Sequence, residues 1–219
     1  MKRKNIFKSL LAAAMALTMI FGAAPLSGFV GISLPMLSLK AEAATTEDGL
    51  FEYEVEKKLT GSEYEYGVRI TRYKGPNSGE VVIPETIEGY EVKWISSYAF
   101  SNCKNITEIT IPDSVTEIGN YAFDNCTSLS KVQLSNGLTK IGDYAFYYCK
   151  NLTEITIPDS VTEIGNYAFD NCTSLSKVQL SNGLTKVGDY AFSDCTNLTE
   201  ITVPDSVTEI GDDAFYYCT

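Results

Sequence analysis

Histidine is absent from this 219-residue chain, and tryptophan occurs only once. The missing histidine removes the most common general base and a very common metal ligand. Basic residues are also few, with 17 lysines and arginines against 28 aspartates and glutamates. An acidic surface of this kind repels nucleic acid, which is therefore not expected as a partner. No nucleophile is paired with an identifiable base, so we expect no enzymatic activity, no metal site and no cofactor.

Long apolar runs are confined to the N-terminal part of the chain. Four basic residues precede an apolar stretch that starts at Leu10, and Ala41-Glu42-Ala43 matches an Ala-x-Ala cleavage site. This pattern predicts a secretory signal peptide over residues 1–43 and a secreted mature chain. An uncleaved membrane anchor is the alternative, but five glycines and prolines between residues 22 and 35 interrupt the stretch as a spanning helix. Cleavage leaves 12 basic and 27 acidic residues, a net charge of −15, and we expect no membrane insertion afterwards.

The cysteines never have a second cysteine or a histidine close by in sequence. Each follows an Ala-Phe pair at the same distance, and they recur every 23 residues: Cys103, Cys126, Cys149, Cys172, Cys195 and Cys218. A fixed period of this length is the signature of a solenoid whose repeats bury one continuous core. Equivalent cysteines point the same way, and the ~4.8 Å strand spacing does not suit the ~3.8 Å Cβ separation of a disulfide. We therefore expect buried free thiols.

Residues 44–79 follow a different pattern from the rest of the chain. Apolar and polar residues alternate from Phe51 and again up to Tyr73, with Thr60-Gly61-Ser62 between the two runs. This predicts a β-hairpin that caps the first repeat, followed by a loop up to Gly79. The solenoid then covers residues 80–219, and its first repeat carries five extra residues around Gly89 that we expect to form a surface loop.

One repeat can be followed from Leu152. Ile155 and Ile157 face inward from a short strand, Pro158 turns the chain, and a second extended piece ends at Gly165. We then expect one helical turn, capped by Asn166, that places the Ala-Phe pair and the cysteine on one buried face.

The consensus of the repeat is Leu-x-x-Ile-x-Ile-Pro-x-Ser-Val-x-x-Ile-Gly-x-x-Ala-Phe-x-x-Cys. It resembles the leucine-rich repeat of the BspA-like bacterial surface proteins over residues 81–219. That resemblance implies a curved solenoid at the bacterial cell surface, sometimes with an adhesive role. It carries over no catalytic residue, because the matched positions belong to the core.

The true period of the surface is 46 residues. Residues 104–149 and 150–195 differ only at Ile106/Leu152, Ile141/Val187, Tyr147/Ser193 and Tyr148/Asp194. Consequently, Glu and Lys alternate between neighbouring repeats in two rows, one from Glu108 to Glu200 and one from Glu117 to Glu209. Since like charges would otherwise face each other at ~4.8 Å, we interpret the alternation as a folding device.

Two surfaces are candidates for ligand contact. The first, here called the neutral row, consists of Thr110, Gln133, Thr156, Gln179 and Thr202. The second is the pair Tyr147 and Tyr148, which interrupts the repeat pattern. A further row from Tyr98 to Tyr190 could contact a ligand, but we favour mutual stacking of these rings over the core. We therefore expect a secreted or cell-surface module that binds an extracellular protein or glycan, and the alternative is an architectural spacer of a larger surface protein.

Overall fold

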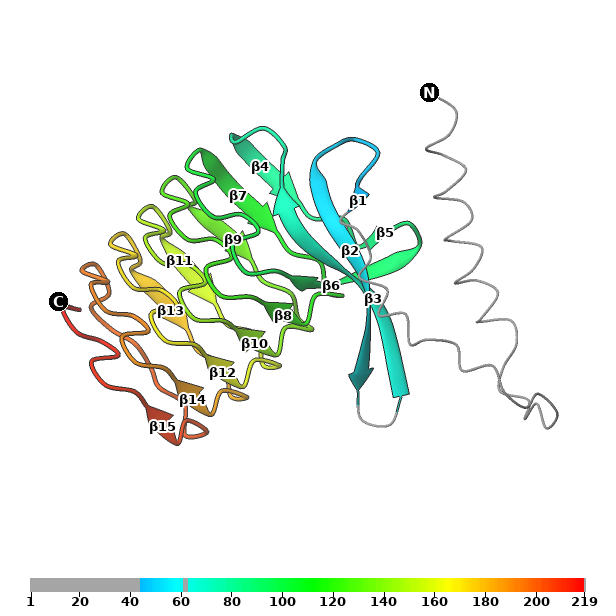
Figure 1. Cartoon of the computed structure of the whole chain (residues 1–219). Helices are drawn as coiled ribbons and strands as arrows, with labels where there is room; N and C mark the ends of the chain where they lie inside the picture. The colour runs from blue at the N-terminus through cyan, green and yellow to red at the C-terminus, as the bar shows by residue number, and fades with distance from the viewer. Residues whose placement is uncertain (1–43, 61–62, 219) are drawn as a thin grey trace, which may run out of the picture. The chain divides into compact units, whose positions relative to one another are not determined.

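The computed structural model describes residues 44–60 and 63–218. The predicted signal peptide lies outside these residues. Each repeat contributes a short strand to each of two sides and a series of turns to the third side (Figure 1). The predicted 23-residue solenoid is confirmed, with strands built from alternating apolar and polar residues.

The N-terminal part begins with an antiparallel arrangement that continues directly into the solenoid. Its strands are β1 (Ala44–Thr45), β2 (Phe51–Thr60), β3 (Glu63–Tyr73), β4 (Gly79–Val82), β5 (Thr86–Ile87) and β6 (Tyr90–Ile95). β2 and β3 form the predicted hairpin, and β3 pairs in parallel with β6 of the first repeat. The hairpin thus covers the edge of the first repeat by main-chain pairing.

The strands of the later repeats fall on two sides. The first side carries β7 (Ile106–Thr110), β9 (Lys131–Gln133), β11 (Glu154–Thr156) and β13 (Lys177–Gln179). The second side carries β8 (Glu117–Ile118), β10 (Lys140–Ile141), β12 (Glu163–Ile164), β14 (Lys186–Val187) and β15 (Glu209–Ile210). Strands of the second side extend the sheet that begins with β1, β2, β3 and β6, whereas the first side is divided into β4-β7-β9 and β11-β13.

The third side of each repeat was expected to be a helical turn, and this expectation is wrong for the described residues, which contain no helix. In the second full repeat, the amide of Ala122 donates to the carbonyl of Gly119 three residues back, but the next amide, of Phe123, donates to Ala145 in the following repeat. In this alternating pattern, each repeat has two left-handed residues four positions apart, such as Tyr121 (φ 58°) and Asn125 (φ 56°). Half of the backbone amides from Tyr121 to Cys126 thus donate to carbonyls of the next repeat.

The expected cap residues also act between repeats. The side-chain oxygen of Asp143 accepts from the amide of Asn166 at 2.9 Å, and that of Asn166 accepts from the amide of Asp189 at 2.9 Å. An N-cap would instead bond within its own turn. The expectation that Asn166 caps its own turn is therefore wrong, because its side chain accepts from a backbone amide of the next repeat.

The extra residues of the first repeat form a hairpin instead of the expected loop. Ile87 pairs with Tyr90, so only Glu88 and Gly89 connect β5 to β6. Both have positive φ, 53° and 82°, as a tight two-residue β-turn requires.

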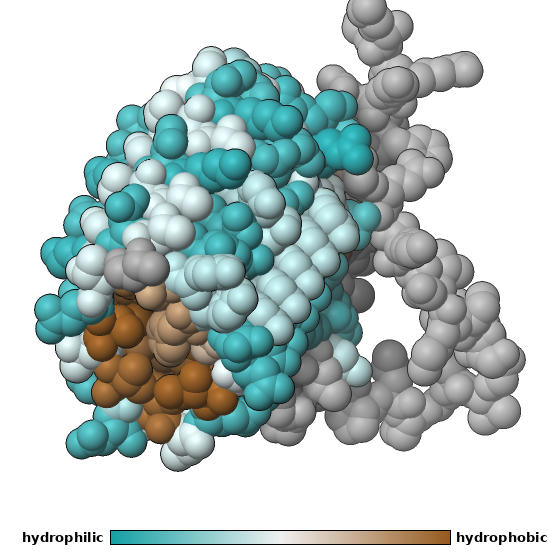
Figure 2. All heavy atoms as spheres, turned by 90° about the vertical axis from the view of Figure 1, so that its left-hand side faces the viewer, coloured by the Kyte–Doolittle hydropathy of each residue, from teal (hydrophilic) through white to brown (hydrophobic). Residues whose placement is uncertain are grey.

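The core is one continuous stack of equivalent side chains. Phe100, Phe123, Phe146, Phe169 and Phe192 are each at most 1% exposed, and neighbouring rings stack at 5.0–5.2 Å. The cysteines lie beside them as free thiols, and Cys149 donates to the carbonyl of Phe123 at 3.2 Å. The four inner cysteines are buried as expected, but Cys103 and Cys218, at the two ends of the row, are only half-buried. At the last repeat, where Ile210 is 50% exposed, an apolar patch faces outward (Figure 2).

Candidate binding surface

The neutral row lies on the first side of the solenoid. Thr110 is directly paired with Gln133, and Thr156 with Gln179, by the parallel registers of β7-β9 and β11-β13. Thr110 is half-buried, whereas the side chains of the other four residues of the row are exposed. Thr202 follows the same position of its repeat but has no assigned strand around it. The structure therefore brings the predicted residues into one polar row, most regular from β7 to β13.

Charges next to the neutral row are paired between repeats. Glu108 forms an ion pair with Lys131, and Glu154 lies 3.8 Å from Lys177. The predicted opposite neighbours are therefore confirmed on this side. Each pair is solvated, so its effect is mainly to avoid repulsion and to leave the neutral row without a strong local field.

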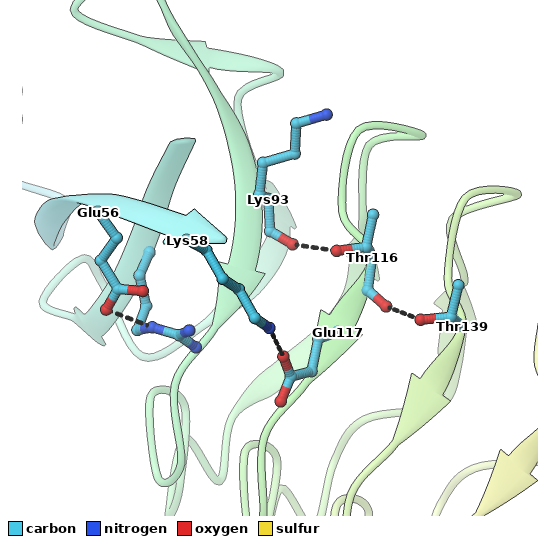
Figure 3. Close-up of polar contacts among 7 residues, drawn as sticks. Glu56, Lys58, Lys93, Thr116, Glu117 and Thr139 are labelled. Carbon is cyan, nitrogen blue, oxygen red and sulfur yellow. Dashed lines mark hydrogen bonds and ion pairs between the residues drawn. The ribbon is translucent and has the colours of Figure 1, made fainter. Parts of the chain in front are cut away.

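On the second side, the hairpin supplies a contact that the sequence did not predict. Lys58 of β2 donates to Glu117 of β8 at 3.2 Å, which connects the cap with the charged row (Figure 3). Lys186 and Glu209 form a further ion pair of 2.7 Å in that row. The repeat pattern could not reveal the role of Lys58, because the hairpin lies outside the repeat.

Threonine hydroxyls on the second side are used by the fold. Thr116 donates to the carbonyl of Lys93 at 3.2 Å, and Thr139 donates to the carbonyl of Thr116 at 2.9 Å (Figure 3). The same contact recurs in later repeats. These hydroxyls are therefore bonded to neighbouring repeats, unlike the side chains of the neutral row. The sequence alone could not distinguish these two groups of polar residues.

Tyr147 and Tyr148 lie on the third side, after the buried Ala-Phe pair, and so form a surface separate from the neutral row. The Tyr147 ring is edge-on to Tyr144 at 5.4 Å and to Tyr148 at 4.5 Å. Burial, together with nearby Tyr148 and Asp170, raises the pKa of Tyr147 to about 12. Lys150 places its ammonium 5.0 Å from the centre of the Tyr148 ring. The pair is a half-buried aromatic cluster with a cation beside it.

The row from Tyr98 to Tyr190 is a face-to-face stack. Centroids of successive rings are 4.5–4.9 Å apart and their planes differ by 5–6°. Each inner ring therefore has both faces covered by its neighbours. This is the mutual stacking that we favoured, and it leaves mainly ring edges for contact with other molecules.

The described residues offer little for metal or thiol chemistry. No group of three or more Cys, Asp or Glu side chains within residues 44–60 and 63–218 could hold a metal ion. Burial raises the pKa of the Cys149 and Cys172 thiols well above the ordinary value, which disfavours the reactive thiolate. Within the same ranges, no helix has the length and apolar character needed to cross a membrane.

Comparisons with known proteins agree with this architecture. The family "BspA type Leucine rich repeat region" matches residues 93–219 with six copies. A leucine-rich repeat protein of T. pallidum is 30% identical with a TM-score of 0.59, and the match covers 80% of this chain and 89% of that one. A leucine-rich cell surface protein of Faecalibacterium prausnitzii is 33% identical with a TM-score of 0.56, over 81% of this chain and 52% of that one.

A third solved structure, the pneumococcal vaccine antigen PcpA, is 25% identical with a TM-score of 0.66, over 81% of this chain and 48% of that one. The chain therefore spans most of the T. pallidum protein and about half of the other two. A comparison with curated proteins finds no match. The matching repeats, their 23-residue stacking and the identity over most of the T. pallidum protein show that the chain belongs to the BspA-type leucine-rich repeat family.

Proposed function

We propose that this protein is a non-catalytic binding module, exported to the bacterial surface, that holds an extracellular protein or glycan through the outer face of the first side. The observation that carries the proposal is the neutral row. Four of its five Gln and Thr side chains are exposed, at regular spacing, while the adjacent charges are paired with each other. The description of the Faecalibacterium relative as a cell surface protein supports the proposed location.

The exposed side chains of this surface project from a row of short parallel strands, so a ligand would lie along the row. Repeats one strand spacing apart, at ~4.8 Å, present the same polar groups again and again. A partner with its own periodic polar groups gains affinity by engaging several repeats at once, although each contact is weak. We therefore expect binding to strengthen with the number of repeats.

The test is capture of extracellular-matrix proteins and glycans from an array by the mature protein and by a variant. Gln133→Arg, Thr156→Arg and Gln179→Arg together place bulk and charge on the neutral row and should abolish capture. Thr139→Arg, Thr162→Arg and Thr185→Arg add the same charge at exposed positions of the second side. Each substitution also removes a hydroxyl that bonds to a neighbouring repeat, so thermal unfolding first verifies that this variant is folded, and its capture should then persist.

Equal loss in both triple variants would assign the effect to charge and contradict the neutral row as the site. If the unmodified protein captures nothing, the repeats are better explained as an architectural spacer. In two relatives the matched region is only about half of the chain, which gives that second role a structural basis.

A further inference from the structure

On the third side lie two positions of the repeat whose residues differ between repeats, although most of the repeat is nearly constant. They form a surface that consists of the two residues after each Ala-Phe pair and is here called the corner stripe: Ser101-Asn102, Asp124-Asn125, Tyr147-Tyr148, Asp170-Asn171, Ser193-Asp194 and Tyr216-Tyr217. Main-chain hydrogen bonds join its members across repeats, such as that from the amide of Tyr148 to the carbonyl of Asp170 at 3.0 Å. The core needs no tyrosine here, because Ser193 and Asp194 occupy the same positions in an almost identical repeat.

Aromatic pairs occur at two places in the corner stripe. Tyr147 and Tyr148 lie in one repeat, and Tyr216 and Tyr217, 48% and 59% exposed, lie three repeats further on. At ~4.8 Å per repeat, the two pairs are ~14 Å apart along the solenoid. Lys150 already lies over the Tyr148 ring, so an aromatic ring of this stripe attracts a cation within the protein itself.

Carboxylates lie beside the first pair in both neighbouring repeats. Asp170 is 6% exposed, and its carboxylate accepts a hydrogen bond from the Asn171 amide at 2.9 Å. Asp124 accepts from the Ser101 hydroxyl at 3.1 Å. No ion pair with Lys or Arg is formed by either aspartate or by Asp194 within the described ranges. Negative charge therefore gathers next to the tyrosines. The ammonium of Lys150 lies over the Tyr148 ring and, within the described ranges, forms no ion pair with these carboxylates, whereas the charges beside the neutral row are paired with each other.

We propose that the corner stripe binds an extended, arginine-bearing segment of a partner protein, a step that rests on the proposed binding function and names the chemistry of one partner. A guanidinium group is planar, stacks on aromatic rings and pairs with carboxylates through two parallel hydrogen bonds. An extended chain advances ~3.3 Å per residue, so arginines four residues apart reach both tyrosine pairs. Their charges balance Asp124, Asp170 and Asp194.

A neutral glycan fits this stripe less well. The rings of Tyr147 and Tyr148 pack edge-on at an interplanar angle of 67°, which leaves no broad aromatic platform for a sugar ring. A neutral sugar also leaves the unpaired carboxylates without a counter-charge. A glycan at these residues is therefore an outcome that would contradict the proposal.

The test uses the mature protein with isotope-labelled tyrosines and the capped peptide Gly-Arg-Gly-Gly-Gly-Arg-Gly. Resonances of Tyr147, Tyr148, Tyr216 and Tyr217 should shift during titration, with little change at the remaining tyrosines. Replacing both arginines of the peptide by citrulline keeps the shape and removes the charge, and should abolish the shifts. A peptide with lysines should bind more weakly than the arginine peptide, because the ammonium group cannot stack or pair in a planar fork.

The matched variant is Tyr147→Ser with Tyr148→Asp, which reproduces the Ser193-Asp194 repeat and should therefore fold. It adds one negative charge, so attraction by net charge alone would hold the peptide at least as tightly. Loss of the aromatic contact should instead weaken binding about fivefold. Unchanged or tighter binding by this variant, or equal binding of the citrulline peptide, would overturn the proposal.

Failure of this inference can be separated from failure of the proposed function. If an array partner is captured through the neutral row while the arginine peptide shifts no tyrosine, the corner stripe is not a binding site and the proposed function stands. If a soluble glycan shifts the four tyrosines and the peptide does not, the partner chemistry stated here is wrong.

Discussion

At the scale of single residues, the phenylalanine column accounts for much of the core. Phe169 is fully buried between Phe146 and Phe192, with ring centroids 5.2 Å away on both sides. Phe169→Ala should therefore lower the free energy of unfolding by ~3–5 kcal/mol. Tyr148→Asn is the control, because asparagine occupies that place in three sister repeats and tolerates its left-handed φ of 58°. It should stay within about 0.5 kcal/mol of the parent protein. Equal losses in chemical denaturation would contradict the inward register.

Asp170 makes the stability depend on pH in an unusual direction. Burial raises the pKa of this carboxyl above its ordinary value, so the folded protein binds its proton more tightly than the unfolded chain. This penalty is absent at low pH and appears as pH rises from the unfolded pKa, about 3.9, to the raised folded pKa. Asp170→Asn should therefore be more stable than the parent protein at pH 7, and the difference should shrink at pH 3.5. Urea denaturation at both pH values provides the measurement, and a difference that is independent of pH would contradict the stated cause.

At the scale of elements, the turns of the third side need glycine where neighbouring repeats approach each other closely. A Cβ atom on Gly165 would lie 2.6 Å from the backbone nitrogen of Asp143 in the preceding repeat. Gly165→Ala should therefore force the two turns apart and cost ~1–3 kcal/mol of stability. Thr156→Ala, at an exposed position of the same repeat, should have little effect. Thermal unfolding of both variants distinguishes them, and an unchanged midpoint for Gly165→Ala would show that the turns can separate freely.

The turns of the third side also show why the pattern within one repeat does not predict its local structure. Ala168, Phe169 and Cys172 have the three- and four-residue spacing of a helical face, and successive turns satisfy the same spacing. A helix is disfavoured here because alternate amides find acceptors in the next repeat, as the amide of Phe169 does at the carbonyl of Ala191, 2.8 Å away. That acceptor exists only once the repeats are stacked, so a single repeat read alone favours the wrong local structure.

At the scale of the whole molecule, the 46-residue unit should be interchangeable. Deletion of residues 104–149 joins Cys103 to Lys150 and keeps a glutamate beside Glu80, as in the parent protein, where Glu80 pairs with Glu108. Deletion of residues 127–149 instead sets Glu108 against Glu154 and Glu117 against Glu163. Both proteins should fold, because each repeat contacts only its neighbours.

Salt distinguishes the two deletions. Screening weakens repulsion between exposed like charges, so the 23-residue deletion should gain more thermal stability between low salt and 1 M salt. The 46-residue deletion serves as the control, because it keeps the alternation of Glu and Lys between the repeats that remain. Identical salt responses would remove the case for charge alternation, and a molten 46-residue deletion would show that the repeats are not equivalent.

The sequence by itself determined the period, the inward positions and the charge alternation, because each is repeated often enough to be read from spacing alone. Phe169 and Cys172 are buried where the 23-residue step places them, and Glu108 lies beside Lys131. The neutral row followed from the same argument, since residues at equivalent positions of a solenoid must form a row.

Only the tertiary structure decided which polar groups remain free. Thr139 and Gln133 are both polar residues at repeated positions of the sequence. The hydroxyl of Thr139 bonds to the preceding repeat, whereas Gln133 is paired with Thr110 only through its backbone register. Likewise, the carboxylates beside Tyr147 come from residues 23 positions before and after it, Asp124 and Asp170. Such contacts form between stacked repeats. Their hydrogen-bond and charge partners are therefore defined only in the folded solenoid.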